Sequence, residues 1–96
     1  MISHNYTSGT SRTTAVQRMN DSKFYPALLS FLKEQRLALG LSQKALAIKL
    51  GRPQSYVGKV EVGDRRLDIY EFVIYCRALG MNPSSLLSDT LRKSPL

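Results

Sequence analysis

The chain is poor in the residues that usually build catalytic and metal sites. Its 96 residues include one cysteine, Cys76, one histidine, His4, and no tryptophan. A single cysteine excludes an internal disulfide and any zinc site made of several cysteines. The sequence also shows no Cys–His pairing, no paired carboxylates in an apolar stretch and no glycine loop of the kind that cradles phosphates. We therefore expect no enzymatic activity, no metal and no cofactor.

Long apolar runs are also missing. No stretch approaches the roughly 18 apolar residues that are needed to cross a bilayer, and the N-terminus has no hydrophobic signal core. We expect a cytoplasmic protein without a membrane partner. Because 96 residues suffice for one domain at most, no separate domain for a small-molecule effector is expected.

Acidic residues are scarce, and the charge that remains is concentrated. The chain has 7 acidic and 14 basic residues, a net charge of +7 and a pI near 9.9. Residues 33–66 carry eight basic and three acidic side chains, whereas residues 67–96 are neutral overall. A strongly basic segment favours anionic partners, namely nucleic acid, an anionic membrane or an acidic protein.

The chain divides into a tail and a helical domain. Residues 1–21 are rich in Ser, Thr and Asn and lack apolar periodicity, which predicts a flexible N-terminal tail. Residues 22–96 show helical spacing throughout and no two-residue alternation, which predicts an all-α domain. Capping residues and glycines divide this domain into five helices. The predicted helices begin near Ser22, Ser42, Pro53 or Gln54, Asp68 and Asn82, with Leu28, Leu32, Leu39, Leu46, Ala47, Leu50, Val57, Val60, Tyr70 and Tyr75 packing inward.

The stretch "LGRPQSYVGKVEVG", residues 50–63, stops a helix and restarts it within a few residues. Gly51 can supply the positive φ that reverses the chain, and Pro53 is tolerated in the first turn of a new helix. Val57 and Val60 then lie on one face, where they can pack onto the helix before the break. This arrangement predicts a helix-turn-helix, two helices that cross through a short turn.

The opposite face of the restarted helix carries polar, small and basic groups. Gln54, Ser55 and Lys59 lie there, near the N-terminal end, which is the arrangement that reads base edges in a major groove. A glutamine amide can pair with adenine through two hydrogen bonds, and a lysine can donate to guanine. Gly58 would let this helix approach DNA closely. For Tyr56, on a flank, a phosphate contact and packing at the rim both stay open.

The segments "GLSQKALAIKLGRPQSYVGKVEVGDRRLDIYEF" and "CRALGMNPSSLL" resemble the lambda-repressor-like helix-turn-helix domains of the Cro/C1 or xenobiotic-response-element type. The resemblance covers residues 28–91. It implies a five-helix fold, binding to double-stranded DNA as a homodimer and work as a transcriptional regulator, most often a repressor.

Particular roles follow from the same resemblance. It implies that Gln43 contacts a phosphate, that Arg65 and Arg66 approach the DNA backbone, and that Arg36 and Glu61 form an ion pair joining the first and third helices. The candidate DNA contacts are Gln43, Lys44, Gln54, Ser55, Tyr56, Lys59, Arg65 and Arg66.

The last predicted helix supplies a candidate interface. Leu86, Leu87 and Leu91 are too many apolar side chains for one short terminal helix to bury against a small domain, so we expect residues 82–91 to form a homodimer contact. A second interpretation stays open, in which the protein is an interaction module, such as an antitoxin or adaptor, whose main partner is another protein. The sequence does not reveal the DNA site that is bound.

Overall fold

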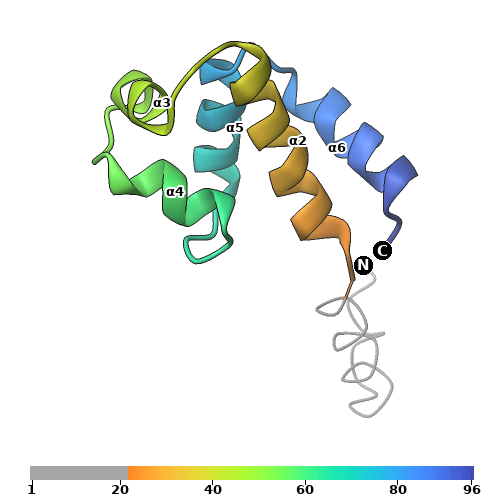
Figure 1. Cartoon of the computed structure of the whole chain (residues 1–96). Helices are drawn as coiled ribbons and strands as arrows, with labels where there is room; N and C mark the ends of the chain where they lie inside the picture. The colour runs from red at the N-terminus through yellow and green to blue at the C-terminus, as the bar shows by residue number, and fades with distance from the viewer. Residues whose placement is uncertain (1–21) are drawn as a thin grey trace.

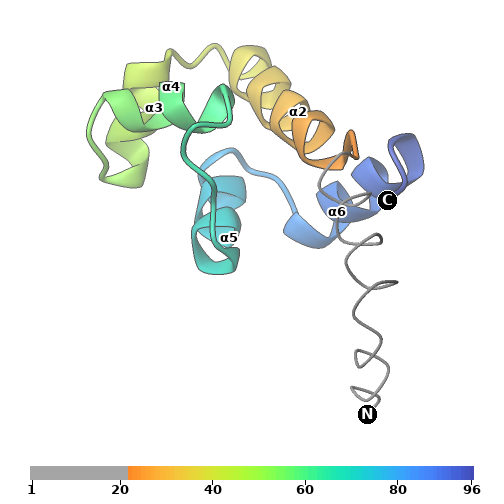
Figure 2. The same cartoon turned by 90° about the horizontal axis from the view of Figure 1, so that it is seen from below.

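The computed structural model of the chain describes residues 22–96. The predicted tail, residues 1–21, lies outside the described residues. The described part contains helices and no strands, which confirms the all-α prediction. The helices are α2 (Phe24–Ala38), α3 (Gln43–Leu50), α4 (Ser55–Glu61), α5 (Ile69–Ala78) and α6 (Pro83–Lys93). Figures 1 and 2 show α3 and α4 together at one end and α6 at the other, with α2 and α5 between them.

Three of the helices begin at side-chain caps that the sequence predicts. The hydroxyl of Ser42 accepts a hydrogen bond from the backbone N–H of Ala45 at the start of α3. Asp68 and Glu71 form a reciprocal capping box at the start of α5. The amide oxygen of Asn82 caps α6. Each cap satisfies backbone donors that would otherwise lack a partner in the first helical turn, so these boundaries are set locally.

The turn between α3 and α4 has the geometry that the sequence predicts. Gly51 lies at φ +65°, in the left-handed region, and the N–H of Arg52 returns to the carbonyl of Ala47. The helix after the turn begins at Ser55, slightly later than expected. The Gln54 side chain makes no capping bond, and the first bond of the new turn runs from the N–H of Tyr56 to the carbonyl of Pro53.

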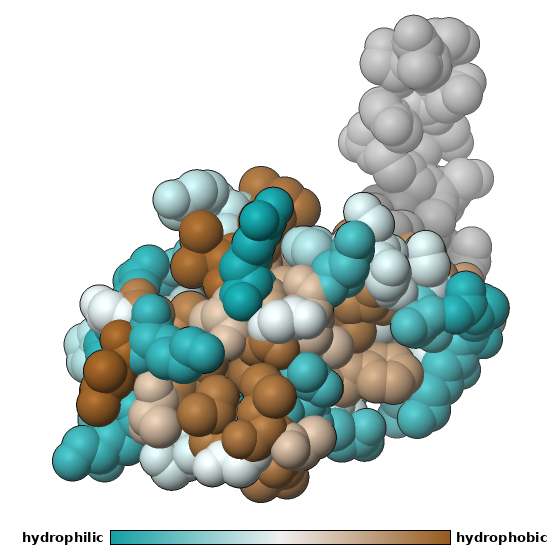
Figure 3. Space-filling view, turned by 90° about the horizontal axis from the view of Figure 1, so that it is seen from above, coloured by the Kyte–Doolittle hydropathy of each residue, from teal (hydrophilic) through white to brown (hydrophobic). Residues whose placement is uncertain are grey.

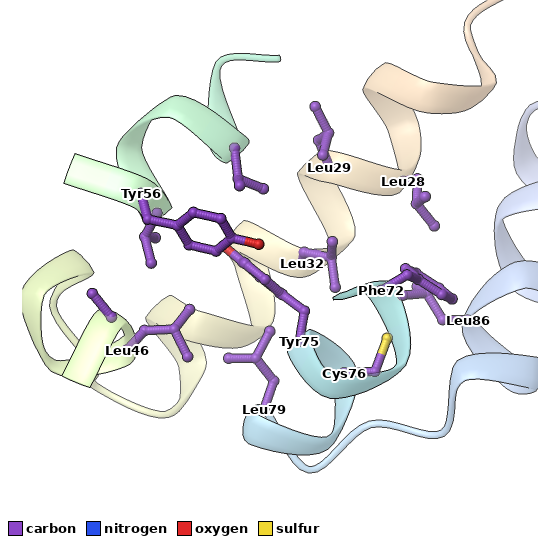
Figure 4. Packing of buried hydrophobic residues seen from close by; sticks show 13 residues of the cluster. Leu28, Leu29, Leu32, Leu46, Tyr56, Phe72, Tyr75, Cys76, Leu79 and Leu86 are labelled. Carbon is purple, nitrogen blue, oxygen red and sulfur yellow. The ribbon is translucent and has the colours of Figure 1, made fainter. Parts of the chain in front are cut away.

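The core is one cluster to which every helix contributes, with α5 at its centre (Figure 4). Tyr75 and Cys76 of α5 and Leu79, directly after it, are almost completely buried, as are Leu32 of α2 and Leu46 of α3. Burial raises the pKa of the Cys76 thiol to about 11. The Tyr75 hydroxyl is also buried, and no group of residues 22–96 lies within hydrogen-bond reach of it.

The structure corrects two of the expected core positions. Leu39 is 49% exposed because it lies beyond the end of α2. Tyr70 is 72% exposed because it lies on the face of α5 that points away from the core. Leu50 is half-buried and packs against the core, as expected. Apolar side chains therefore also reach the surface, and Figure 3 shows one face on which they gather between hydrophilic ones. Among the described residues, no helix has the length and apolarity that a membrane crossing requires.

Candidate nucleic-acid interface

Helix α4 presents two chemically different faces. Tyr56, Val57 and Val60 are buried against the domain, whereas Gln54, Ser55 and Lys59 are exposed. Val62, directly after the helix, is 72% exposed although it is apolar. The outer face is therefore available to a partner, and the buried inner face fixes the orientation of α4.

One carboxylate on α4 joins three helices. The guanidinium of Arg36, on α2, binds both carboxylate oxygens of Glu61, with Nε–Oε2 at 2.6 Å and Nη2–Oε1 at 3.1 Å. The side chains are only 7% and 4% exposed, so the predicted pair is present and buried. The amide of Gln43, the first residue of α3, donates to Glu61 Oε1 at 2.9 Å. These three residues, here the Glu61 cluster, lock α2, α3 and α4 together.

Gly58 leaves room for Gln43. A Cβ atom at Gly58 would lie 3.3 Å from the side-chain oxygen of Gln43, closer than such atoms normally approach. A side chain at this position would therefore require Gln43 to shift slightly. Lys44, the next residue of α3, is exposed.

A second carboxylate holds two arginines on the other flank of α4. Glu71, on α5, is bonded by Arg52, at 3.3 Å, and by Arg65 through both of its carboxylate oxygens. Both guanidiniums also lie over the ring of Tyr56, at 5.0 and 5.5 Å from its centre, within the range of a cation–π contact. Arg52, Tyr56, Arg65 and Glu71 are here called the Glu71 cluster.

The electrostatics of the Glu71 cluster follow from its hydrogen bonds. The backbone N–H of Asp68 and, after it, the Arg65 guanidinium lower the pKa of the Glu71 carboxyl below its ordinary value. The pKa of the Tyr56 hydroxyl is raised, first by burial and then by the negative charge of Glu71. Glu71 is therefore ionised at neutral pH and Tyr56 is neutral.

Two of the residues predicted to contact DNA, Tyr56 and Arg65, make contacts within the protein. Tyr56 is only 8% exposed, so of the two alternatives for this residue the structure favours packing, and a phosphate contact is not supported. Arg65 is committed to Glu71 and Tyr56, although its side chain stays 42% exposed. Sequence reasoning did not find Glu71 and Arg52 as its companions, because Glu71 was recognised only as the partner of Asp68 in a capping box.

Arg66 has different surroundings from its neighbour. Its guanidinium lies 4.5 Å above the ring of Tyr25, and no carboxylate among residues 22–96 pairs with it. The hydroxyl of Tyr25 accepts a hydrogen bond from the backbone N–H of Leu67 at 3.3 Å. Of the two adjacent arginines, Arg66 thus keeps its charge unneutralised.

Known proteins share the sequence pattern and the fold of this chain. A family model described as "Helix-turn-helix" matches residues 32–86, and a solved structure described as an XRE-family like protein from Pseudomonas syringae pv. tomato is 46% identical, with a TM-score of 0.74 over 82% of this chain and 95% of that chain. The chain belongs to the XRE family of helix-turn-helix proteins. It is a DNA-binding transcriptional regulator, as the resemblance implied, and the family is not one of enzymes.

Two further solved structures are similar to this XRE-family chain. The restriction-modification controller protein C.AhdI from Aeromonas hydrophila is 38% identical, with a TM-score of 0.57 over 62% of this chain and 91% of that chain. A hypothetical transcription factor from Neisseria is 26% identical, with a TM-score of 0.60 over 72% of this chain and 84% of that chain. No curated protein matches the chain.

Proposed function

We propose that the protein is a homodimeric repressor that reads the major groove with the outer face of α4. The observation that carries this proposal is the exposure of Gln54, Ser55 and Lys59 on one side of a helix whose other side is buried. Because Val57 and Val60 fix the rotation of α4 about its axis, the polar side chains point in one defined direction. A helix presented in this way suits insertion into a groove.

The candidate contacts divide into base-reading and backbone-binding groups. Gln54 can bind adenine through two hydrogen bonds, Lys59 can donate to guanine, and Ser55 can pair with several bases. Gln43 uses one amide hydrogen for Glu61, which leaves the other for a phosphate. Lys44 and Arg66 supply positive charge to the backbone, and Arg65 contributes its charge from within the Glu71 cluster.

Replacing Gln54 by Ala tests base reading. The variant should lose about 1–3 kcal/mol on the preferred duplex and relax the preference at one base pair, while binding to random duplex DNA stays nearly unchanged. The preferred duplex is obtained by selection from a random pool, and binding is measured by fluorescence anisotropy. Equal weakening on both duplexes would show that α4 is not the reading element.

The surface for homodimerisation needs revision from the sequence expectation. Leu86 is only 3% exposed because it packs in the core of its own chain, so we leave it out of the proposed dimer contact. Leu91 is 44% exposed and Leu87 is half-buried. Leu87 lies beside Ile69, which is 76% exposed, around a shallow apolar hollow that Leu28 and Phe72 also line.

We propose that a second copy covers this surface, which includes Ile69 and Leu87, together with Leu91 about one helical turn further along α6. A single short recognition helix reads few base pairs, whereas a two-fold dimer reads two half-sites about 34 Å apart. Ile69→Glu should therefore give a monomer in sedimentation experiments and weaken binding to the preferred duplex. Ile48→Glu is the matched control, since Ile48 is 68% exposed on α3, away from this surface. A dimer that survives Ile69→Glu would contradict the proposed surface.

Repression requires only that the protein bind DNA, whereas activation also requires a contact with the transcription machinery. A dimer bound across a promoter excludes polymerase by occupying the DNA, without any further contact. A reporter gene placed behind the selected duplex should therefore fall in expression when the protein is produced, and the Gln54→Ala variant should restore it. A rise in expression would instead show an activator.

A further inference from the structure

A hollow lies beyond the end of α4, on the side of α2. It has a volume of about 570 Å³ and is lined by α2 as far as Lys33, by Ser22 before it, by the end of α4 and the loop that follows, and by Leu96. Tyr25 and Lys33 line it from α2, and Val62, Gly63 and Arg66 line it from the other side. The hollow therefore begins where the outer face of α4 ends.

The charge around this hollow is positive. Lys33 and Arg66 are both exposed, and neither has a carboxylate partner among the described residues. Glu61 also lines the hollow, but its carboxylate is occupied by Arg36 and Gln43 and its side chain is 4% exposed. An anion at this place would meet two cations that have no carboxylate partner among the described residues.

Tyr25 touches two consecutive residues of the loop after α4. Its ring lies under the Arg66 guanidinium, with 4.5 Å between the guanidinium carbon and the ring centre. Its hydroxyl accepts the backbone N–H of Leu67 at 3.3 Å. The Tyr25 side chain thus fixes the backbone of the loop and also orients Arg66. Because Arg66 is already oriented, it would lose less conformational freedom on binding a ligand.

We propose that Lys33, across the hollow, binds the same backbone phosphate as Arg66, and that Tyr25 is a positioning residue for Arg66. The proposal rests on the proposed placement of α4 in the major groove. With α4 in the groove, a DNA strand runs past each side of the helix, and the hollow lies on one of those sides. The contact adds affinity for any sequence, because phosphates carry no base information.

The number of phosphates can be counted from the dependence of binding on salt. Arg66→Ala and Lys33→Ala should each lower the slope of log K against log salt by about one on random duplex DNA. Arg77→Ala is the matched control, because Arg77 is an exposed arginine on α5 that lines no part of the hollow and has no carboxylate partner in the described chain. If the two variants change the slope no more than Arg77→Ala does, no phosphate occupies the hollow and the proposal is wrong.

A double-mutant cycle tests the role of Tyr25. Tyr25→Leu should weaken binding to random duplex about twofold to fivefold, the value of an exposed cation–π contact. Tyr25→Phe, which keeps the ring, should restore most of this loss. In the Arg66→Ala background Tyr25→Leu should have no further effect, because the arginine that it positions is gone. An equal loss in both backgrounds would show that Tyr25 acts only through the stability of the fold, which would overturn its assignment.

The same measurements separate this inference from the proposed function. Gln54→Ala reports on base reading by α4, and the salt slopes report on the hollow. If Gln54→Ala lowers only specific binding while the hollow variants match Arg77→Ala, the inference fails and the proposed function stands. If Gln54→Ala weakens all duplexes alike, the proposed placement of α4 fails, and the inference that depends on it fails for that separate reason.

Discussion

The Glu61 cluster and the Glu71 cluster flank α4 with the same chemistry and different exposure. In the first, Arg36 and Glu61 are 7% and 4% exposed. In the second, Glu71 is similarly buried at 8%, but its partners Arg52 and Arg65 are 44% and 42% exposed. Both carboxylates hold neighbouring segments together, yet only Glu71 holds cations that water can reach.

This difference separates two uses of an arginine. A charge that is fully removed from water must be paired, and losing its partner is costly. A charge that remains half in water can exchange one partner for another at little cost, since solvent compensates during the exchange. The Glu61 cluster therefore secures the fold, whereas the arginines of the Glu71 cluster can still present their charge to a phosphate.

The largest effect is expected at Glu61. Glu61→Gln leaves the buried Arg36 without its counter-charge and should lower the free energy of unfolding by about 3–5 kcal/mol. Urea denaturation followed by circular dichroism gives this value. Asp64→Asn, three residues further on at an exposed position, is the matched control and should change stability little. A Glu61→Gln variant with the same free energy of unfolding as Asp64→Asn would show that the pair contributes nothing.

A smaller loss is expected for Glu71→Gln, because both arginines remain accessible to water. This loss should shrink as salt is added, since salt screens exposed charges much more than buried ones. The loss for Glu61→Gln should stay nearly constant over the same range. Melting temperatures of both variants at low and high salt make the comparison, with the exposed pair of Arg92 and Asp89, broken by Asp89→Asn, as the control. Equal salt dependence of the two losses would remove the distinction between the clusters.

Acid should weaken the Glu71 cluster in a defined pH range. The folded state lowers the pKa of Glu71 below its ordinary value of 4.5, so between the two pKa values the unfolded chain binds the proton and the folded one does not. The contribution of Glu71 to stability is therefore fully present above pH 4.5 and disappears as the pH falls through the lower, folded-state pKa. Stability measured against pH should fall more steeply for the parent than for Glu71→Gln, and parallel curves would refute the assignment.

The smallest effect is expected at Gly58, beside the Glu61 cluster. Gly58→Ala gains up to about 1 kcal/mol of helix propensity but places its Cβ 3.3 Å from the side-chain oxygen of Gln43. Because Gln43 is exposed and the approached atom is the oxygen at the end of its side chain, we expect this side chain to move aside and the net gain to be below about 1 kcal/mol. In a Gln43→Ala background the gain should be larger. A net loss in that background would show that Gly58 is required for another reason.

Local signals explain why most of the fold was predictable. Ser42, Asp68 and Asn82 are caps whose partners lie three residues away, so they mark helix starts without reference to the rest of the chain. The turn at Gly51 needs only a residue that tolerates positive φ. The Arg36–Glu61 pair, in contrast, joins residues far apart in the sequence, and it was predicted only because a known family shares it.

Burial and long-range partners were harder to predict. Tyr70 and Tyr75 both suit a helical core by spacing, but only Tyr75 points into the cluster. Tyr56 was assigned to a flank because its burial depends on how α4 sits against α5. The Glu71 cluster combines the turn before α4, the loop after it and α5, and no local pattern indicates that these three segments meet.

The buried thiol of Cys76 is a chemical probe of core opening. In the closed core its pKa of about 11 and its complete burial keep it from forming the thiolate that reacts with thiol reagents. Labelling therefore proceeds only when the core opens, and its rate in native buffer measures how often that happens. Because the sequence holds no second cysteine and no tryptophan, this one sulfur reports core opening in a chain that lacks tryptophan fluorescence.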